Sequence, residues 1–256
     1  MTALPLAGRV AVVIGGTSGI GLALVRGLAE AGADVVPISR RREQVEAAAA
    51  EVEALGRRTT RVAADVSDRP SLEAALQQVV SELETVDILV NCAGITKRTP
   101  TLDVSDQEWT SIIDTNLTGT WRSCQVFGRH MLARGYGRII NIASLASFVG
   151  LFEVAAYTAS KAAVAGLTRA LAVEWGQRGV NVNAIAPGVF RTALNAALLD
   201  GTARGREFLL RTPMQRFGRV EELSGACVFL ASEGASFVNG EVLAVDGGFL
   251  ASGVNQ

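Results

Sequence analysis

Short apolar runs rich in valine, isoleucine and alanine alternate along the chain with longer stretches in which apolar residues recur every three or four positions. The runs contain few polar positions, as in the strands of a parallel sheet covered on both faces. They predict seven strands, over residues 9–16, 34–39, 59–65, 87–94, 137–144, 179–188 and 240–248. The longer stretches predict helices over residues 20–31, 42–55, 68–83, 106–131, 154–175 and 221–231.

This alternation predicts a single α/β domain over residues 1–256, a doubly wound parallel sheet of the Rossmann type with about seven strands and helices on both faces. No linker, low-complexity tract or short repeat divides the chain. Pro37 has no backbone N–H, so the second strand is expected to end there or to lie at an edge of the sheet. Residues 189–218 are the least regular stretch, and we expect them to close over the substrate as a lid.

Composition and charge narrow the classes of function. Hydrophobic residues make up 49% of the 256 residues, enough for one large core, and the formal net charge of −1 attracts neither nucleic acid nor an anionic membrane. No signal peptide or membrane span is recognised, so we expect a cytoplasmic location. Three scattered cysteines and one histidine, His130, are too few for a metal site, and no metal is expected.

The turn after the first strand is rich in glycine. Gly15, Gly19 and Gly21 form a G-x-x-x-G-x-G pattern before a helix, with Thr17, Ser18 and Ile20 between them. Such a turn brings backbone N–H groups and the positive end of a helix against a pyrophosphate. A Walker A loop is excluded because leucine follows Gly21 where that motif needs lysine. A tight packing turn would also contain glycine, but the position after the first strand favours a nucleotide site.

The end of the second strand bears on which nucleotide binds. In NAD-binding proteins of this type a carboxylate there holds the ribose 2′-hydroxyl. This chain instead has Ser39 followed by Arg40, Arg41 and Arg42. Arginines at the start of a helix oppose its dipole, and the 2′-phosphate of NADP would relieve that conflict; the alternative is a solvated run of charge. The sequence therefore favours NADP(H), without excluding NAD(H).

Further cofactor contacts are expected where other strands end, because ligands bind at the carboxyl ends of parallel strands. Asp65, followed by Val66, closes the third predicted strand. It is a candidate for the adenine amino group, or else it binds backbone N–H groups of its own turn. Asn91, Ala93 and Gly94 close the fourth strand, where small residues let a flat ring lie against the backbone.

Tyr157 and Lys161 stand four positions apart in a predicted helix, so they share one face. They are one of only two tyrosines and one of only two lysines in a chain with 22 arginines. A nearby ammonium lowers the pKa of a phenol, which suits a general acid/base near neutral pH. By spacing alone a surface pair is the commoner case, so the assignment depends on the rest of the chain.

The order of the motifs resembles the short-chain dehydrogenase/reductase family over almost the whole chain. The motifs are the glycine turn, "NCAG" at 91–94, Asn116 in "DTNLTG", Ser144 in "NIAS", "YTASK" at 157–161 and "APG" at 186–188. Each is weak alone, but six in this order are specific to the family. Two positions depart from its usual pattern: Ile14 stands where threonine is frequent, and Ser18 where many NADP-preferring members have a basic residue.

The resemblance implies a role for each matching residue. Tyr157 would exchange a proton with the substrate oxygen, and Ser144 would hydrogen-bond the same oxygen. Lys161 would bind the nicotinamide ribose and depress the pKa of Tyr157, and Asn116 would hold a water in a proton relay. The remaining residues implied at the nicotinamide are Pro187, Gly188, Val189 and Thr192.

The substrate is expected to be a small-molecule ketone or secondary alcohol. Residues 91–100 and the C-terminal third resemble gluconate 5-dehydrogenases and deoxygluconate dehydrogenases. Lys97 and Arg98 follow the fourth strand and could pair with a sugar-acid carboxylate, or could be solvated loop charges. Phe148 and Phe152 instead suggest a more apolar pocket for a bulkier ketone.

Two alternatives therefore remain open. One is a 3-oxoacyl-carrier-protein reductase or a broad ketone reductase of the same family, and the other is a non-catalytic nucleotide-binding protein. The intact set of Asn116, Ser144, Tyr157 and Lys161 argues against the second. The resemblance also implies a homotetramer, in which the helices bearing Asn116 and Tyr157 pair between subunits.

Overall fold

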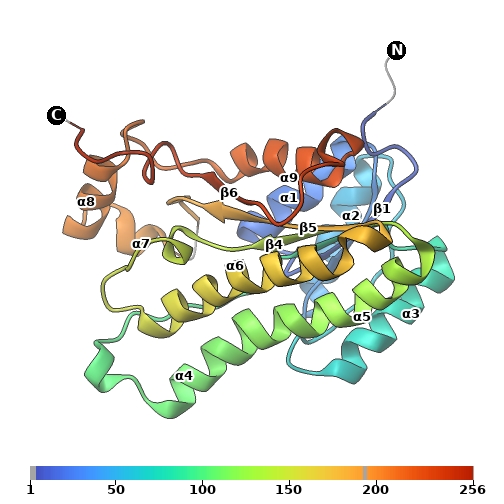
Figure 1. Ribbon diagram of the computed structural model, residues 1–256, viewed down its shortest axis with the longest axis horizontal. Helices are drawn as coiled ribbons and strands as arrows, with labels where there is room; N and C mark the ends of the chain where they lie inside the picture. The colour runs from blue at the N-terminus through green and yellow to red at the C-terminus, as the bar shows by residue number, and fades with distance from the viewer. Residues whose placement is uncertain (1–3, 193–194, 256) are drawn as a thin grey trace.

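The computed structural model describes residues 4–192 and 195–255, and its centre is a parallel sheet of six strands in the order β2-β1-β3-β4-β5-β6 (Figure 1). The strands are β1 (Val10–Ile14), β2 (Asp34–Ile38), β3 (Ile88–Asn91), β4 (Gly137–Ile142), β5 (Val180–Pro187) and β6 (Val242–Val245). Four of them, β1, β3, β4 and β5, are buried throughout, as expected of near-continuous apolar runs inside a covered sheet.

Helices cover both faces of the sheet (Figure 1). The helices α3 (Arg69–Leu83), α5 (Gly119–Arg134) and α6 (Ala155–Trp175) pack on one face, and α1 (Gly19–Glu30), α2 (Arg42–Ala54) and α9 (Ser224–Ala231) pack on the other. The remaining α-helices are α4 (Asp106–Ile113), α7 (Ala196–Leu199) and α8 (Ala203–Arg211). Single-turn helices are η1 (Thr101–Asp103), η3 (Leu145–Ser147), η4 (Gly176–Arg178), η5 (Val220–Leu223) and η6 (Glu233–Ala235), and η2 (Asp114–Thr118) is a π-helical turn.

The prediction of a seventh strand over residues 59–65 is wrong. Within this segment a single bridge joins Ala63 to Ser39, just beyond the end of β2. The backbone N–H groups of successive β2 residues point in turn toward β1 and toward the segment on the other side of β2. The N–H of Val35 points toward this segment and donates to the Arg58 carbonyl. Pro37 faces the same side and has no hydrogen to donate, so the ladder is interrupted there. The proline thus places β2 at the sheet edge, as predicted, and also prevents another regular strand.

The carboxyl ends of the parallel strands all lie on the left of the sheet in Figure 1, and the segments that follow the strands meet there. The excursion predicted over residues 189–218 holds α7 and α8 at this edge. Its two ends meet in a bridge between Phe190 and Gly218, so it leaves and rejoins the domain at one point. Residues 193–194 of it, like residues 1–3 and 256 of the predicted domain, lie outside the described residues.

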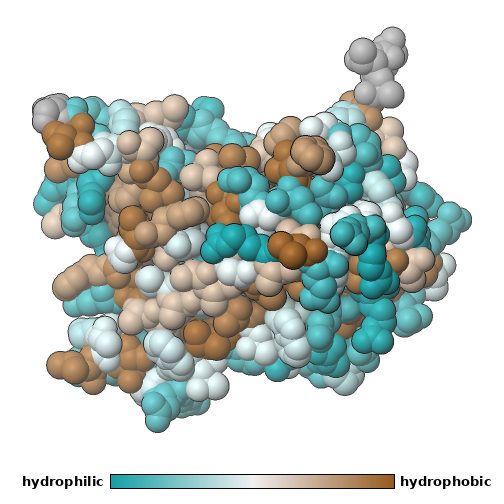
Figure 2. Space-filling model, viewed as in Figure 1, coloured by the Kyte–Doolittle hydropathy of each residue, from teal (hydrophilic) through white to brown (hydrophobic). Residues whose placement is uncertain are grey.

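Figure 2 shows apolar side chains gathered at the end of the molecule that carries α7 and α8. Exposed apolar residues of this end include Phe152, Leu198 and Leu210. Elsewhere in this view hydrophilic residues cover most of the surface. No helix in the described part of the chain is long and apolar enough to cross a lipid bilayer.

Candidate functional site

The glycine turn lies at the carboxyl end of β1, and its backbone leaves no room for side chains at two of the three glycines. A Cβ on Gly15 would lie 2.6 Å from the backbone nitrogen of Ala93, and a Cβ on Gly21 would lie 2.0 Å from the carbonyl oxygen of Gly15. Gly15 also has a φ of +79°, which favours glycine. The turn is therefore packed against the end of β3, and it leads into α1, whose N-cap residue is Ser18.

The start of α1 keeps its first N–H groups free of a side-chain cap. Ser18 is the N-cap residue, but its hydroxyl accepts no capping hydrogen bond from the helix. The Thr17 hydroxyl instead donates to Gln44 of α2 at 3.3 Å, and Ile20 packs against the core. Free N–H groups at the positive end of a 12-residue helix suit an anion such as a pyrophosphate.

The end of β2 presents a buried hydroxyl and two arginines beside the glycine turn. The Ser39 hydroxyl is buried and has no hydrogen-bond partner among the described residues. Arg41 is the N-cap residue of α2, as the sequence predicted for this basic run. The Arg40 side chain is 73% exposed, and its Nη1 lies 3.8 Å from Oδ2 of Asp65. So long and exposed an ion pair contributes little, which leaves the Arg40 guanidinium available to another anion.

Asp65 satisfies the groups of its own turn, which is the simpler of the two roles considered for it. Its Oδ1 accepts from the N–H and the hydroxyl of Ser67 at 2.9 and 2.7 Å. Partial burial raises the pKa of Asp65, but these hydrogen bonds and the charge of Arg40 outweigh burial and lower it. Val66 packs against Gly119 at the start of α5, where an added Cβ would lie 2.8 Å from its side chain.

The residues that close β3 border the site through their backbones. The Asn91 amide donates to Oδ1 of Asn141 on β4 at 2.9 Å and to Cys124 of α5 at 3.3 Å, so its side chain lies between the sheet and α5. A Cβ on Gly94 would lie 3.6 Å from Nζ of Lys161. The absence of a side chain at Gly94 therefore keeps open the space next to that ammonium.

Tyr157, Lys161 and Ser144 come together where β4 ends and α6 begins. Nζ of Lys161 lies 5.7 Å from the centre of the Tyr157 ring and donates to the Ile142 carbonyl at 2.6 Å. The Ser144 hydroxyl lies beside the Tyr157 phenol, whose pKa it lowers, and it accepts from the Ala146 N–H at 3.2 Å. Lys161 and Ser144 are buried, and Tyr157 is half-buried. The expected Tyr–Lys–Ser grouping is thus present in space.

The ionisation of this group differs from the sequence prediction in one respect. Burial raises the pKa of Tyr157, and the Ser144 hydroxyl opposes that rise only in part. Burial also lowers the pKa of Lys161 to about 8. A depressed pKa was expected for Tyr157, but desolvation raises it instead. The phenol is therefore protonated at neutral pH, as a general acid must be.

Asn116 lies in the π-helical turn η2, which interrupts the single helix predicted over residues 106–131. It is fully buried, and its amide exchanges hydrogen bonds with the backbone of Ile95, accepting at 2.8 Å and donating at 2.9 Å. It also donates to the Ser160 hydroxyl at 3.1 Å, and Ser160 in turn donates to the Tyr157 carbonyl at 2.7 Å. Asn116 thereby ties the segment after β3 to the turn that carries Tyr157.

Ser160 is a site residue that the sequence interpretation missed. It lies inside "YTASK", and its spacing of three from Tyr157 was a usable signal. The π-helical turn was missed too, although such turns often occur at functional sites. Its sequence, "DTNLT", has no feature that separates it from the α-helices on either side.

The segment after β5 borders the same crevice from the opposite side. The N–H of Gly188 donates to Val245 at 2.8 Å, which extends the pairing that Pro187 makes with β6. Val189 accepts from Gly218 at 2.9 Å. Thr192 faces the glycine turn, because a Cβ on Gly19 would lie 3.8 Å from its methyl group. The segment after β5 and the glycine turn therefore lie on opposite sides of a space in which one extended ligand could contact both.

Each of the two cations expected to meet a sugar acid is paired with a carboxylate. Nζ of Lys97 lies 2.7 Å from Oε2 of Glu108, and Nε of Arg98 lies 2.6 Å from Oε2 of Glu153. Phe152 is 70% exposed at the mouth of the site. These partners could not be recognised from the sequence, since Glu153 is 55 residues from Arg98.

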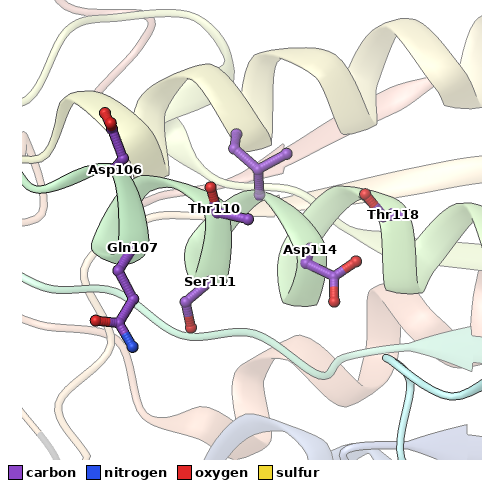
Figure 3. Close-up of a pocket in the computed structure, with 7 residues that line it drawn as sticks. Asp106, Gln107, Thr110, Ser111, Asp114 and Thr118 are labelled. Carbon is purple, nitrogen blue, oxygen red and sulfur yellow. The ribbon is translucent and has the colours of Figure 1, made fainter.

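Two hollows lie away from this grouping. One is a groove along α4 and η2, lined by Asp106, Gln107, Thr110, Ser111, Ile113, Asp114 and Thr118 (Figure 3). The other is a cavity of about 180 Å³ at the base of the excursion, between Phe190, Thr212 and Asp246. Neither contains Ser144, Tyr157 or Lys161. No cluster of metal-ligating side chains occurs within residues 4–192 and 195–255.

Comparisons with known proteins agree with this geometry. A family model described as enoyl-(acyl carrier protein) reductase matches residues 15–250. Gluconate 5-dehydrogenase of Gluconobacter oxydans is 40% identical over 247 residues, which cover 96% of each chain. The 2-dehydro-3-deoxy-D-gluconate 5-dehydrogenase of Bacillus subtilis is 43% identical over 248 residues, 97% of each. The crystal structure of a gluconate 5-dehydrogenase from Burkholderia cenocepacia, in complex with NADP and tartrate, superposes with a TM-score of 0.93 at 40% identity, covering 98% of both chains.

Proposed function

The chain belongs to the short-chain dehydrogenase/reductase family, and on this basis we propose that it reduces the ketone of a sugar acid with NADPH and catalyses the reverse oxidation. Family membership makes it an oxidoreductase that acts on CH–OH donors. The observation that carries the proposal is the grouping of Tyr157, Lys161 and Ser144 at the carboxyl edge of the sheet.

The residues present fit NADP, nicotinamide adenine dinucleotide phosphate. The uncapped start of α1 suits the pyrophosphate, and Ser39, Arg40 and Arg41 would hold the 2′-phosphate. The unpartnered, buried Ser39 hydroxyl supports this, because buried polar groups normally have a partner. When bound, the cofactor supplies the hydride.

The side chains of the grouping supply the proton chemistry. Ser144 donates a hydrogen bond to the substrate oxygen and holds it beside the phenol of Tyr157. Tyr157, protonated at neutral pH, gives its proton to the carbonyl oxygen during reduction. The ammonium of Lys161 stabilises the phenolate that results and binds the ribose. Asn116 holds a water through which Tyr157 regains its proton.

The names of the relatives support a sugar acid as substrate. The two curated relatives act on gluconate and on 2-dehydro-3-deoxy-D-gluconate, and the Burkholderia protein binds tartrate. We take 5-keto-D-gluconate as the first substrate to test. The exposed rings of Phe148 and Phe152 favour a second candidate, a bulkier apolar ketone or acyl thioester.

Initial rates of NADPH oxidation separate these substrates. We expect the highest kcat/KM with 5-keto-D-gluconate, compared with an acetoacetyl thioester and a hydrophobic aryl ketone. Activity on the thioester or the aryl ketone alone would replace the sugar-acid assignment with the second candidate. NADPH binding with no turnover of any of them would indicate a protein without catalytic function.

Replacing Arg40 with alanine will weaken NADPH binding about 10- to 100-fold and leave NADH binding unchanged. The reason is that a charge-assisted hydrogen bond to the 2′-phosphate contributes about 1.5–3 kcal/mol, and only NADPH has that group. Fluorescence titration with both nucleotides measures the effect. Arg58→Ala is the matched control, since Arg58 pairs with Asp34 at the other end of β2. Equal loss of NADH affinity would contradict the assignment.

We also propose that the protein is a homotetramer in which α4, α5 and α6 pair between subunits. The groove along α4 (Figure 3) and the exposed rings of Trp109 and Trp121 support this, because such surfaces are common at interfaces. Light scattering should give the mass of four chains, and the mass of one chain would overturn the proposal.

A further inference from the structure

Arg204, on helix α8 of the excursion over residues 189–218, is a half-buried guanidinium that makes no ion pair with a carboxylate among residues 4–192 and 195–255. Its Nη1 donates to the Phe152 carbonyl at 3.2 Å, and its Cζ lies 5.4 Å from the centre of the Phe208 ring. Burial lowers the pKa of Arg204, and the charge of Arg98 lowers it further. The charges of Glu207 and Glu153 oppose this shift only in part, so a further anion beside Arg204 would be favourable.

Arg98, on the other side of the segment Phe152–Glu153, also has unused hydrogen-bond donors. Among the described residues it donates only through Nε, to Glu153. Its Cζ lies 5.7 Å from the centre of the Phe152 ring. The terminal Nη groups of Arg98 therefore remain free while Glu153 fixes the orientation of the side chain. Arg98 and Arg204 thus flank the segment Phe152–Glu153 and both present unused N–H groups.

This pair of guanidiniums lies at the mouth of the site. Arg98 follows β3, Phe152–Glu153 follows β4, and Arg204 follows β5, so the three segments rise from neighbouring strand ends. The N–H of Thr99 donates to the Glu153 carbonyl at 2.9 Å, which joins the first two segments. Glu153 is only four residues before Tyr157. A substrate whose ketone meets Tyr157 can place its far end between these segments.

We propose that Arg204 and Arg98 together form the subsite for the substrate carboxylate, and that Arg204 is the residue of the lid that selects acids over uncharged sugars. This inference rests on the proposed function and adds to it the group on the lid that recognises the acid. A planar carboxylate accepts from two guanidinium N–H groups at once, which gives direction as well as charge. Glu207, further along α8, attracts Arg204 but makes no ion pair with it in the described part of the chain, so the guanidinium keeps N–H groups for a ligand.

The test compares an acid with its uncharged counterpart in the Arg204→Met variant. L-Sorbose differs from 5-keto-D-gluconate in having an alcohol where the acid has its carboxylate. We expect the ratio of kcat/KM for the acid to kcat/KM for L-sorbose to fall about 10- to 100-fold, mainly through KM. Arg206→Met is the matched control, because Arg206 lies on the same helix, is exposed, and its guanidinium donates only to the Gly201 carbonyl among the residues that the structure describes. An unchanged ratio in Arg204→Met would overturn the inference.

A binding measurement keeps the subsite separate from the reaction. D-Gluconate and D-glucitol are titrated into the NADPH complex by calorimetry, where neither can be oxidised. We expect Arg204→Met to weaken D-gluconate about 10- to 100-fold relative to D-glucitol. If 5-keto-D-gluconate is not turned over but gluconate binding still depends on Arg204, the proposed substrate is wrong and the carboxylate subsite stands. Gluconate binding that is unaffected by Arg204→Met, or absent from the unmodified protein, would defeat the subsite.

Discussion

Replacing Tyr157 with phenylalanine will lower kcat for ketone reduction about 10³-fold, while NADPH still binds. The change removes one oxygen, the only group in the grouping of Tyr157, Lys161 and Ser144 that is placed and protonated to serve as the acid. General acid catalysis contributes roughly 10²- to 10⁴-fold to a rate, and the remaining hydrogen bond from Ser144 cannot transfer the proton in its place. Single-turnover measurements with saturating NADPH give the size of the loss directly.

The chain provides a matched control in its other tyrosine. Tyr136 precedes β4 at the opposite end of the sheet, where its hydroxyl donates to Glu233 at 2.8 Å and its ring contacts Arg9. Tyr136→Phe removes the same atom far from the site and should leave kcat unchanged. If Tyr157→Phe retained more than a tenth of the activity, the proton would have to come from another group, and the assignment of Tyr157 as the acid would be wrong.

The sequence was most informative where one local pattern determines one local structure. The apolar runs of β1, β3, β4 and β5 could only be strands covered on both faces, and all four are. Helical spacing placed Tyr157 and Lys161 on one face of α6. The glycines of the first turn were recognisable because close packing of backbone against backbone excludes every other residue.

The sequence was less informative where the outcome depends on distant partners. Residues 59–65 have the composition of a strand, but a strand needs a neighbour that donates, and Pro37 removes that donor from β2. The pKa of Tyr157 was judged from Lys161 alone, whereas burial by several segments decides its direction. Arg204 was not noticed, because nothing near it in sequence shows that α8 brings it beside Arg98.

The same dependence explains why the substrate was harder to predict than the chemistry. Proton transfer requires residues at fixed spacing on one helix and the end of one strand, and those positions can be recognised in a single chain. Recognition of the acid depends on loops that follow three different strands. Lys97 and Arg98 were considered either as partners of a sugar-acid carboxylate or as solvated loop charges, but Glu108 and Glu153 pair with them. Only the three-dimensional structure shows that Arg204 lies near Arg98 and makes no ion pair with a carboxylate among the described residues.

Replacing Lys161 with methionine will lower kcat/KM for NADPH about 10³-fold and will remove a pH-dependent cost to stability. The activity falls because the phenolate of Tyr157 loses its cation and the ribose loses a donor. In the unmodified enzyme kcat/KM for NADPH should decline as pH rises through about 8, where Lys161 loses its proton. Lys161→Arg, which stays charged, should have a lower maximum and no such decline.

The stability effect of Lys161→Met has a definite sign because burial lowers the pKa of the lysine in the folded chain only. The folded protein binds this proton with a pKa of about 8, and the unfolded chain with its ordinary value of 10.5. Below pH 8 the full cost of burying the ammonium is present, and between pH 8 and 10.5 it disappears as the folded protein loses the proton first. The gap corresponds to about 3 kcal/mol.

Urea unfolding of both proteins without nucleotide, at pH 7 and at pH 10.5, measures this cost. The free energy of unfolding of the unmodified protein should rise by about 3 kcal/mol relative to that of Lys161→Met across this interval. Lys161→Met also loses the hydrogen bond to the Ile142 carbonyl. That loss lowers the free energy of unfolding of the variant at both pH values, so it has much less effect on the change between pH 7 and pH 10.5. A difference that stayed constant with pH would mean that Lys161 is hydrated in the folded protein. In that case an ammonium of ordinary pKa would serve the site, and the decline of kcat/KM near pH 8 should be absent as well.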